Sequence, residues 1–424
     1  MEVPLPPSEL LQGAESAPAA GGWRLGFRAL RHRNFRLFIG GQLISLVGTF
    51  MQTAAQSWLV WGLAHSEWLL GAVWFCAQIP VFVLAPIGGL AADRYSRHRI
   101  VIATQTLLML QAFALAALTL SGRVQVWHVL VLATFLGVVN AFDMPGRQSL
   151  LIQMTGKADL LSAISLNSAM FNSARVVGPS VAGLVVAAVG EGRCFLFNGI
   201  SFLAVIGALA AMRLPRFVRG PIAPPWRHLV DGFRYVRRAA EIRTLLLMVG
   251  ASAICIMPAM VLMPVFADAV FHRGPRGLGF LMGAMGIGAV VGTLALARRS
   301  KTAGLTDVIF WGAIILGAAF IAFASSTSFY LALAVMTAAG FAVMRQNAAA
   351  NTLIQTLVPD DYRGRIMALY AMTVVGVGPF GSLAAGALAG RIGARWTLAV
   401  SGMLILIIAA VFRNRVRRLA GSFQ

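Results

Sequence analysis

The chain has 424 residues, of which 58% are hydrophobic and only 12% are charged. A soluble domain carries about 25% charged residues, so this composition excludes an ordinary water-soluble fold. The net charge is +21, but the basic residues lie in short segments between apolar runs, without the aromatic-basic pattern of nucleic-acid readers, so no nucleic-acid partner is expected.

The N-terminal stretch, residues 1–22, is rich in Pro, Ala and Gly and is interpreted as a disordered cytoplasmic tail. Beyond it, apolar runs of about 20 residues recur, each long enough to cross a hydrocarbon core of about 30 Å. The runs lie at 37–62, 69–91, 100–120, 126–145, 164–189, 194–212, 244–268, 277–297, 305–325, 329–350, 366–389 and 395–412. They lack the alternation of barrel strands, so the sequence predicts an all-α polytopic membrane protein with twelve transmembrane helices.

The connections between these runs predict the orientation of the chain. With the N-terminus placed in the cytoplasm, the inner connections carry 27 Lys and Arg and the outer connections carry 6. Cytoplasmic loops are enriched in basic residues, so both termini are expected in the cytoplasm, in the inner membrane of a bacterium.

An internal repeat divides the chain into two halves. Residues 151–153, Leu-Ile-Gln, recur at 353–355, and the Gly-Pro pair at 178–179 recurs at 378–379. Two pseudo-symmetric six-helix bundles are therefore expected, at 23–212 and 244–412, which is typical of a transporter. Between them, residues 213–243 are expected to form a cytoplasmic linker with an amphipathic helix, and residues 413–424 a basic cytoplasmic tail.

The connection after the second run carries a specific motif, Gly-Gly-Leu-Ala-Ala-Asp-Arg-Tyr-Ser-Arg over residues 88–97. It resembles the cytoplasmic loop signature of the major facilitator superfamily, although Ser96 replaces the usual second glycine. In that family the acidic and basic residues form a conformational latch between the bundles. The resemblance assigns this role to Gly89, Asp93, Arg94, Arg97, Arg147, Arg363 and Arg365.

Further motifs resemble one branch of that superfamily, which contains the enterobactin exporter and related siderophore and drug efflux proteins. They include Asn-Phe-Arg-Leu-Phe at 34–38 and Val-Pro-Asp-Asp-Tyr-Arg-Gly-Arg at 358–365, and the match covers about residues 24–412. The resemblance implies secondary active export of a small amphipathic or anionic molecule, siderophore-like or drug-like, by alternating access and with protons as the coupling ion. A Gly-Pro pair in the fifth span is associated with exporters, so Gly178, Pro179, Gly378 and Pro379 are expected to act in helix packing or gating.

Polar residues inside the runs are candidates for the wall of a substrate cavity. In the first run they recur every three or four residues on one helical face: Gln42, Ser45, Thr49, Gln52 and Gln56. Such a stripe either faces a cavity or forms hydrogen bonds between helices. The predicted cavity set is completed by Asn172, Arg175, Arg345, Asn347 and Asn351.

Arg175 is the most unusual of these residues. It lies about 11 residues into its run, which at 1.5 Å per residue places it roughly 16 Å deep. A buried arginine costs on the order of 3 kcal/mol in a membrane and needs a partner. It is either a binding point for an anionic or acceptor-rich substrate or a structural donor to neighbouring helices.

No acidic residue lies at the middle of a predicted span, and Asp143 comes closest on the cytoplasmic side. It aligns with Arg345 under the repeat offset of 202 residues. Asp143 is therefore the candidate for proton coupling, because a carboxylate in a membrane can load and release protons as access alternates. The alternative is that Asp143 simply pairs with Arg147, one helical turn away.

Other classes of function are disfavoured. Cys76, Cys194 and Cys255 form no CxxC pair and no histidines have ligand spacing, so neither a metal, a cofactor nor enzymatic catalysis is expected. A phosphate-binding Gly-rich loop with Lys-Ser/Thr is missing from the sequence, which excludes a nucleotide-driven pump. An importer of small organic solutes and a non-transporting sensor remain as alternatives, and the oligomeric state is left open.

Overall fold

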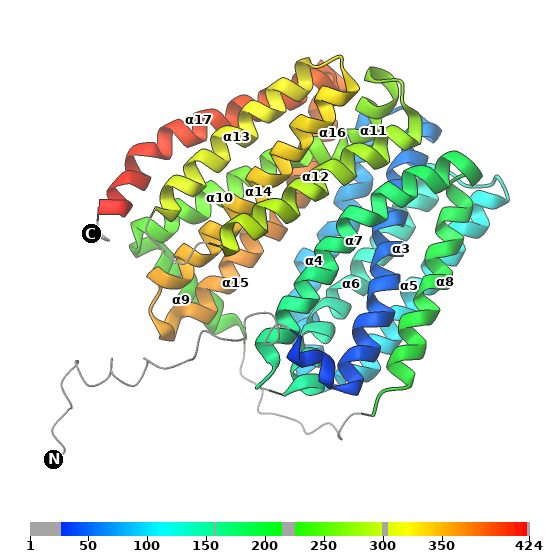
Figure 1. Ribbon diagram of the computed structural model, residues 1–424, viewed down its shortest axis with the longest axis horizontal. Helices are drawn as coiled ribbons and strands as arrows, with labels where there is room; N and C mark the ends of the chain where they lie inside the picture. The colour runs from blue at the N-terminus through cyan, green and yellow to red at the C-terminus, as the bar shows by residue number, and fades with distance from the viewer. Residues whose placement is uncertain (1–26, 157, 214–224, 299–303, 422–424) are drawn as a thin grey trace.

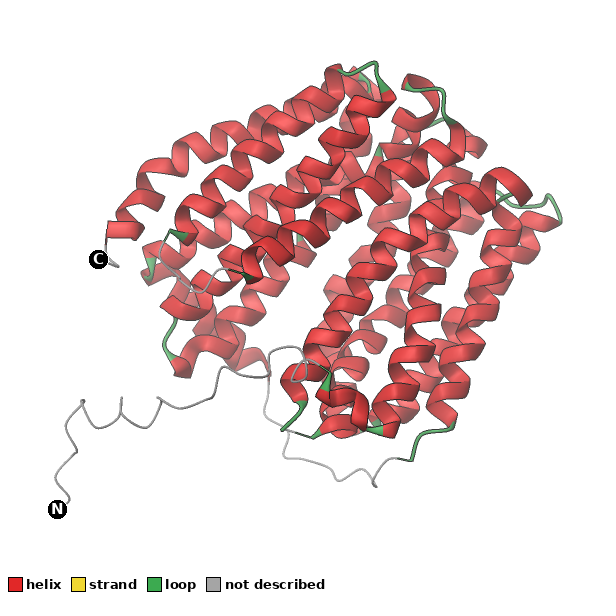
Figure 2. Cartoon of the chain, viewed as in Figure 1, coloured by secondary structure: helices red, strands yellow, loops and turns green. Residues whose placement is uncertain are grey.

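The computed structural model describes residues 27–156, 158–213, 225–298 and 304–421. The predicted tail 1–22 and the proline-rich first part of the linker lie outside these ranges. Within them the chain is helical and contains no strand (Figure 2). Twelve spans in the described ranges are long and apolar enough to cross a membrane, as predicted.

The N-terminal half is built from η2 (Arg28–Arg31), α3 (Arg33–Ala64), α4 (Glu67–Arg94), α5 (Arg97–Leu120), α6 (Val126–Thr155), α7 (Leu160–Val189) and α8 (Glu191–Ala210). A connecting helix follows, α9 (Pro225–Arg238). The C-terminal half is built from α10 (Ala240–Val261), α11 (Met263–Val265), η3 (Phe266–Val270), α12 (Gly274–Ala297), α13 (Leu305–Ser325), α14 (Phe329–Leu357), α15 (Asp360–Gly376), α16 (Gly378–Ile392) and α17 (Ala394–Gly421).

Two spans of the C-terminal half are interrupted. The seventh span consists of α10, α11 and the π-helix η3, and Pro264 lies at the start of α11. The eleventh span breaks at Val377, between α15 and α16, where Pro379 lies in the first turn of α16. Proline has no backbone N–H to donate and restricts the residues before it, so a helix readily ends there. Pro179, the counterpart of Pro379, instead lies inside the continuous helix α7.

The span boundaries follow the apolar runs except where polar residues continue a helix. The last helix, α17, continues to Gly421 through most of the predicted basic tail 413–424. The fourth run was expected to end at residue 145, but α6 continues to Thr155, and α14 continues to Leu357 instead of ending at 350. Backbone hydrogen bonds extend these helices through segments that are not apolar. As a result Asp143, although close to the end of the apolar run, lies 12 residues before the end of α6, about 18 Å along the helix axis.

The two halves lie side by side and are in contact through α4 with α16 and α7 with α12 (Figure 1). We call the end of the molecule that carries α9, η2 and the α4–α5 connection the α9 end, and the opposite end the α11 end. The halves meet at the α11 end and diverge toward the α9 end (Figure 1). The charge bias of the connections predicts that the α9 end is cytoplasmic.

Paired glycines allow the halves to meet. A Cβ added to Gly183 of α7 would lie 2.7 Å from the Pro275 carbonyl oxygen and 3.0 Å from the Cα of Gly279, on α12. On the other side, a Cβ added to Gly71 of α4 would lie 3.0 Å from the Cα of Gly386 on α16. Backbones approach this closely only where side chains are missing, so these pairs determine how tightly the halves can close.

The connecting helix α9 packs against the start of α15. The rings of Tyr235 and Tyr362 stack with centroids 4.7 Å apart. Asp231 Oδ2 lies 3.5 Å from Arg365 Nη1. The amphipathic helix predicted in the linker is therefore present and docks on the C-terminal half, with Phe233 exposed.

Two neighbouring glycines in α4 differ in their surroundings. A Cβ on Gly88 would collide with the carbonyl of Ala141 in α6, whereas a Cβ on Gly89 would meet nothing within 4 Å. We therefore expect Gly88→Ala to lower the stability of the folded protein by about 1–3 kcal/mol because of overpacking, and Gly89→Ala to leave it unchanged. Thermal unfolding of both variants in detergent tests this; equal melting temperatures would contradict the packing described.

Candidate functional site

A central cavity of about 330 Å³ lies between the two halves. The N-terminal half contributes Phe50 and Thr53 of α3, Trp74 of α4, and Arg175 and Pro179 of α7. The C-terminal half contributes a group of methionines from α10, α12 and α14: Met257, Met260, Met282, Met285 and Met344. Methionine is flexible and polarizable, so this wall can adapt to apolar ligands of different shapes.

Arg175 is the charged side chain of this cavity wall. It lies at the middle of α7, half-buried, with its guanidinium carbon 5.1 Å from the centroid of the Phe171 ring. Its Nη1 atom lies 4.0 Å from Met344 Sδ, across the cavity on α14. Among the described residues no carboxylate pairs with Arg175. A guanidinium without an anion in an apolar cavity can bind an anionic or acceptor-rich group of a ligand.

The cavity is closed toward the α11 end by contacts between the halves. Besides the paired glycines, Trp61 of α3 donates its indole N–H to Asp268 Oδ2 of η3 at 2.9 Å. The ring of His65 lies against Trp61, edge to face, at a centroid distance of 5.2 Å. This hydrogen bond was not predicted, since the sequence does not indicate which residues of the two halves face each other; the position of Trp61 and Asp268 near outer span ends was the available signal.

A family model of transmembrane secretion effectors, within the major facilitator transporters, matches residues 25–421. The chain belongs to this family. It is 29% identical to the multidrug efflux pump Tap of Mycolicibacterium fortuitum, over 90% of this chain and 96% of Tap. It is 22% identical to the enterobactin exporter EntS of Shigella flexneri, over 92% of this chain and 96% of EntS. The predicted resemblance to this branch of the superfamily is thereby confirmed.

The fold of this family member agrees with solved transporter structures. A bacterial homologue of the iron transporter ferroportin, solved in an inward-facing state, superposes with a TM-score of 0.69 at 16% sequence identity, covering 91% of this chain and 98% of that one. The predicted fold class, twelve transmembrane helices in the major facilitator fold, is confirmed.

The polar stripe of α3 divides between two environments. Thr49, Gln52 and Gln56 line a second pocket of about 200 Å³, which shares Thr53 and Trp74 with the central cavity. Gln52 is also held within the N-terminal half. Its Nε2 donates to Gln111 Oε1 at 3.0 Å, and its Oε1 accepts from Asn198 Nδ2 at 2.7 Å. Gln52 therefore lines a pocket and also forms hydrogen bonds between helices, the two roles that the sequence allowed for this stripe.

The other two stripe residues lie apart from both pockets. Gln42 and Ser45 are buried in the N-terminal half, and the Oε1 atom of Gln42 has no hydrogen-bond partner among the described residues. Asn172 donates to the Ser168 carbonyl oxygen of its own helix at 2.9 Å. Spacing along a helix indicates a shared face, but it does not indicate what covers each part of that face.

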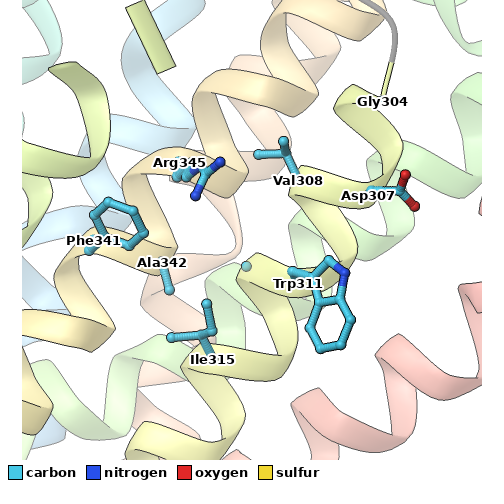
Figure 3. Close-up of a pocket in the computed structure, with 9 residues that line it drawn as sticks. Gly304, Asp307, Val308, Trp311, Ile315, Phe341, Ala342 and Arg345 are labelled. Atoms are coloured by element: carbon cyan, nitrogen blue, oxygen red, sulfur yellow. The ribbon is translucent and has the colours of Figure 1, made fainter. Parts of the chain in front are cut away.

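The predicted cavity residues of α14 lie in different surroundings. Asn347 lines the central cavity, while Asn351 lies one turn beyond it and its Oδ1 accepts a hydrogen bond from Gln355. Arg345 lies outside the central cavity and lines a separate pocket between α13 and α14 (Figure 3). The prediction had assigned Arg345 to the substrate cavity, but its side chain leaves α14 on another face.

Asp143 is fully buried between α6 and α5. Its Oδ1 accepts hydrogen bonds from Thr104 Oγ1 at 2.7 Å and from Gln105 Nε2 at 2.9 Å, and its Oδ2 lies 2.6 Å from Arg147 Nε. The predicted alternative, an ion pair with Arg147, is present. Asp143 lines neither the central cavity nor the second pocket, so a proton would have to reach it through the interior of the N-terminal half.

The contacts described for the predicted latch residues lie within one half or with α9, and none of them joins the two halves. Asp93 and Arg94 are exposed at the end of α4, and Arg97 donates to the Ala92 carbonyl oxygen of its own half at 3.3 Å. Arg363 donates to the Gln355 carbonyl oxygen at 3.3 Å, while Arg365 lies beside Asp231 of α9. This agrees with halves that diverge at the α9 end, where the latch would close in the opposite conformation.

The glycine-proline pairs occupy packing positions. A Cβ on Gly178 would lie 2.5 Å from Phe50 Cβ, so α7 and α3 touch there, and a Cβ on Gly378 would lie 3.2 Å from Gln78 Oε1, across the interface between the halves. The predicted role in packing or gating is compatible with both positions.

A charged cluster not predicted from sequence holds η2 against the α6–α7 connection. Asp159 is buried, with its carboxylate 2.8 Å from His32 Nε2, 2.6 Å from Arg31 Nη2 and 3.2 Å from Arg28 Nε. The hydrogen bond with His32, with the charges of Arg31 and Arg28, holds the pKa of Asp159 below its ordinary value, although burial acts in the opposite direction.

This cluster predicts a pH-dependent stability. Since the folded-state pKa of Asp159 is lowered, its contribution is present above the unfolded value, about 3.9, and is lost as the pH falls through the folded value. We expect Asp159→Asn to lower the melting temperature at neutral pH, and the difference from wild type to shrink below about pH 4. The exposed Asp361 provides the control variant, Asp361→Asn, which should follow the wild-type profile.

Proposed function

We propose that the protein is a secondary exporter that moves amphipathic organic molecules, anionic ones among them, out of the cytoplasm by alternating access. The observation that carries this proposal is the central cavity, which both halves line. In it the guanidinium of Arg175, which has no carboxylate partner among the described residues, faces a wall of methionine and aromatic side chains. A substrate with an apolar body and an acidic or acceptor-rich group would satisfy both parts of this wall.

The direction of transport rests on two further points. Tap and EntS, which resemble this chain over nearly its whole length, are named as an efflux pump and an exporter. The halves are closed at the α11 end, and the charge bias predicts that the α9 end is cytoplasmic. In this conformation the protein would receive its substrate from the cytoplasm.

Transport into inverted membrane vesicles tests the proposal. A panel of amphipathic acids, neutral drugs and catecholates should include compounds that accumulate in vesicles containing the protein, in response to an imposed pH gradient. Accumulation only in right-side-out vesicles would favour the importer, and no accumulation of any compound in either orientation would favour the non-transporting sensor.

The proton-coupling role of Asp143 remains a prediction. Asp143→Asn should keep the hydrogen bond from Gln105 but remove the charge, so if Asp143 carries the coupled proton, transport should no longer respond to an imposed pH gradient. The matched variant is Arg147→Gln, which breaks the same ion pair but leaves the carboxylate. Full gradient response in Asp143→Asn would exclude this residue as the coupling site.

A further inference from the structure

A separate pocket of about 390 Å³ lies between α13 and α14, away from the transport cavity. Its wall includes Val308 and Trp311 of α13, and Phe341 and Arg345 of α14 (Figure 3). Four other residues of α14 line the central cavity: Gly340, Val343, Met344 and Asn347. At about 100° per residue, Arg345 leaves α14 on the face opposite to these four. The pocket therefore faces the surroundings of the bundle, and Trp311, 59% exposed, stands at its rim.

The guanidinium of Arg345 has no carboxylate beside it in the part of the chain that the structure describes. Its Nε atom is buried without a hydrogen-bond partner, and its guanidinium carbon lies 5.4 Å from the centroid of the Phe341 ring. Asp307 also borders the pocket, but its carboxylate points away from Arg345 (Figure 3). Among the described residues no ion pair includes Arg345. A buried guanidinium N–H without an acceptor is costly, so an anion from outside the chain that accepts from Arg345 would stabilise this site.

The start of α13 adds a second source of donors. The helix begins at Leu305 after Gly304, whose backbone has φ +75°, and no side chain in the described part of the chain caps its first turn. The first N–H groups of a helix have no partner within the helix, and its dipole favours an anion there. The pocket reaches from this first turn to Ile315.

The depth of the pocket matches the edge of a bilayer. α13 has 21 residues, which at 1.5 Å per residue is about 31 Å, close to the thickness of the hydrocarbon core. Its first turn therefore lies at the boundary with the lipid headgroups. Tryptophan is enriched near the membrane–water interface, and Trp311 lies six residues after the start of α13, about 9 Å along its axis.

We propose that this pocket binds the phosphate group of a membrane phospholipid from the leaflet at the α9 end. The phosphate accepts hydrogen bonds from Arg345, and the acyl chains lie along the apolar side chains of α13, Val308 and Ile315 among them. The site is distinct from the transport cavity and does not depend on the identity of the transported substrate.

Native mass spectrometry of the full-length protein, titrated with phosphatidylglycerol, tests this site. We expect Arg345→Gln to weaken the tightest lipid-binding event about tenfold, the effect of losing one charge-assisted contact. The control is Arg413→Gln, because Arg413 is also a basic residue at the α9 end and lies over an aromatic ring, Phe310, but is exposed and lines no described pocket. It should bind lipid like wild type, and equal affinity in wild type and Arg345→Gln would overturn the proposal.

Two further ligands identify the chemistry. Diacylglycerol with the same acyl chains lacks the phosphate and should bind equally weakly to wild type and to Arg345→Gln. Inorganic phosphate lacks the acyl chains and should not displace the lipid. Displacement by inorganic phosphate at similar concentration would show a site for soluble anions and overturn the lipid assignment. Should Arg345→Gln fail to fold, Arg345→Lys keeps the charge and should retain part of the affinity, and complete loss in that variant would also contradict a phosphate contact.

Discussion

Gly183→Val is expected to abolish transport while leaving the two bundles folded. A Cβ at this position would lie 2.7 Å from the Pro275 carbonyl oxygen, which is backbone and cannot rotate away. The extra side-chain atoms of valine would force α7 and α12 apart, so the halves could no longer close at the α11 end. A transporter that cannot close on one side cannot complete an alternating-access cycle.

The control for this prediction is Gly207→Val, in the last turn of α8. A Cβ on Gly207 would meet nothing within 4 Å, so this variant makes the same change of residue in a membrane helix without a neighbouring backbone. Both variants should insert at normal abundance and elute as single species in detergent, and only Gly183→Val should lose transport. Full activity in Gly183→Val would show that the contact between α7 and α12 is not needed.

Arg175→Gln is expected to raise the KM for anionic substrates by about tenfold to a hundredfold, because one charge-assisted contact contributes about 1.5–3 kcal/mol. Neutral substrates held by the methionines should be affected much less. The measurement is transport by inverted vesicles with one acidic and one neutral substrate of similar shape.

A matched control lies three residues earlier on the same helix. The amide of Asn172 is bonded to the carbonyl of Ser168 and does not line the central cavity, so Asn172→Ala should leave both KM values unchanged. An equal rise of KM for acidic and neutral substrates in Arg175→Gln would indicate that Arg175 holds the cavity in shape and does not bind the anion.

The sequence predicts the spans well because hydrocarbon thickness imposes a length on each apolar run. It predicts less well where a helix continues beyond the bilayer, as α6 does to Thr155. There the helix is held by backbone hydrogen bonds and by contacts such as that between Asp143 and Arg147, which an apolar run does not reveal.

The site is harder to predict, because it depends on which face of each helix meets which neighbour. The depth of Arg175 in its span predicts a place in the cavity wall, and it does line the cavity, whereas Arg345, also inside an apolar run, leaves its helix on the face opposite to the cavity. The methionines of the cavity were not singled out, since methionine in an apolar run is also an ordinary core residue. Gly88 and Gly89 are adjacent in the motif, yet only the structure distinguishes the one that contacts α6.

The repeat offset of 202 residues shows which polar residues of the two halves correspond to each other. Thr104 and Gln105, which bind Asp143, correspond after 202 positions to Thr306 and Asp307, and Asp143 corresponds to Arg345. The two halves therefore carry related polar positions with opposite charge. In the N-terminal half the charge is satisfied within the chain, and in the C-terminal half it is left open to an external ligand.

The central claim is that the two ends of the interface open and close in opposition around the cavity. Spin labels report this directly, with one pair at the α9 end (the exposed Tyr95 and Gly364) and one pair at the α11 end (the half-buried Ser66 and the exposed Gly390). The distances are measured by electron–electron double resonance without substrate, and again with substrate under an imposed gradient. The distance at the α9 end should shorten under the condition in which the distance at the α11 end lengthens. Distances that stay fixed at both ends under every condition, or that lengthen together, would contradict alternating access.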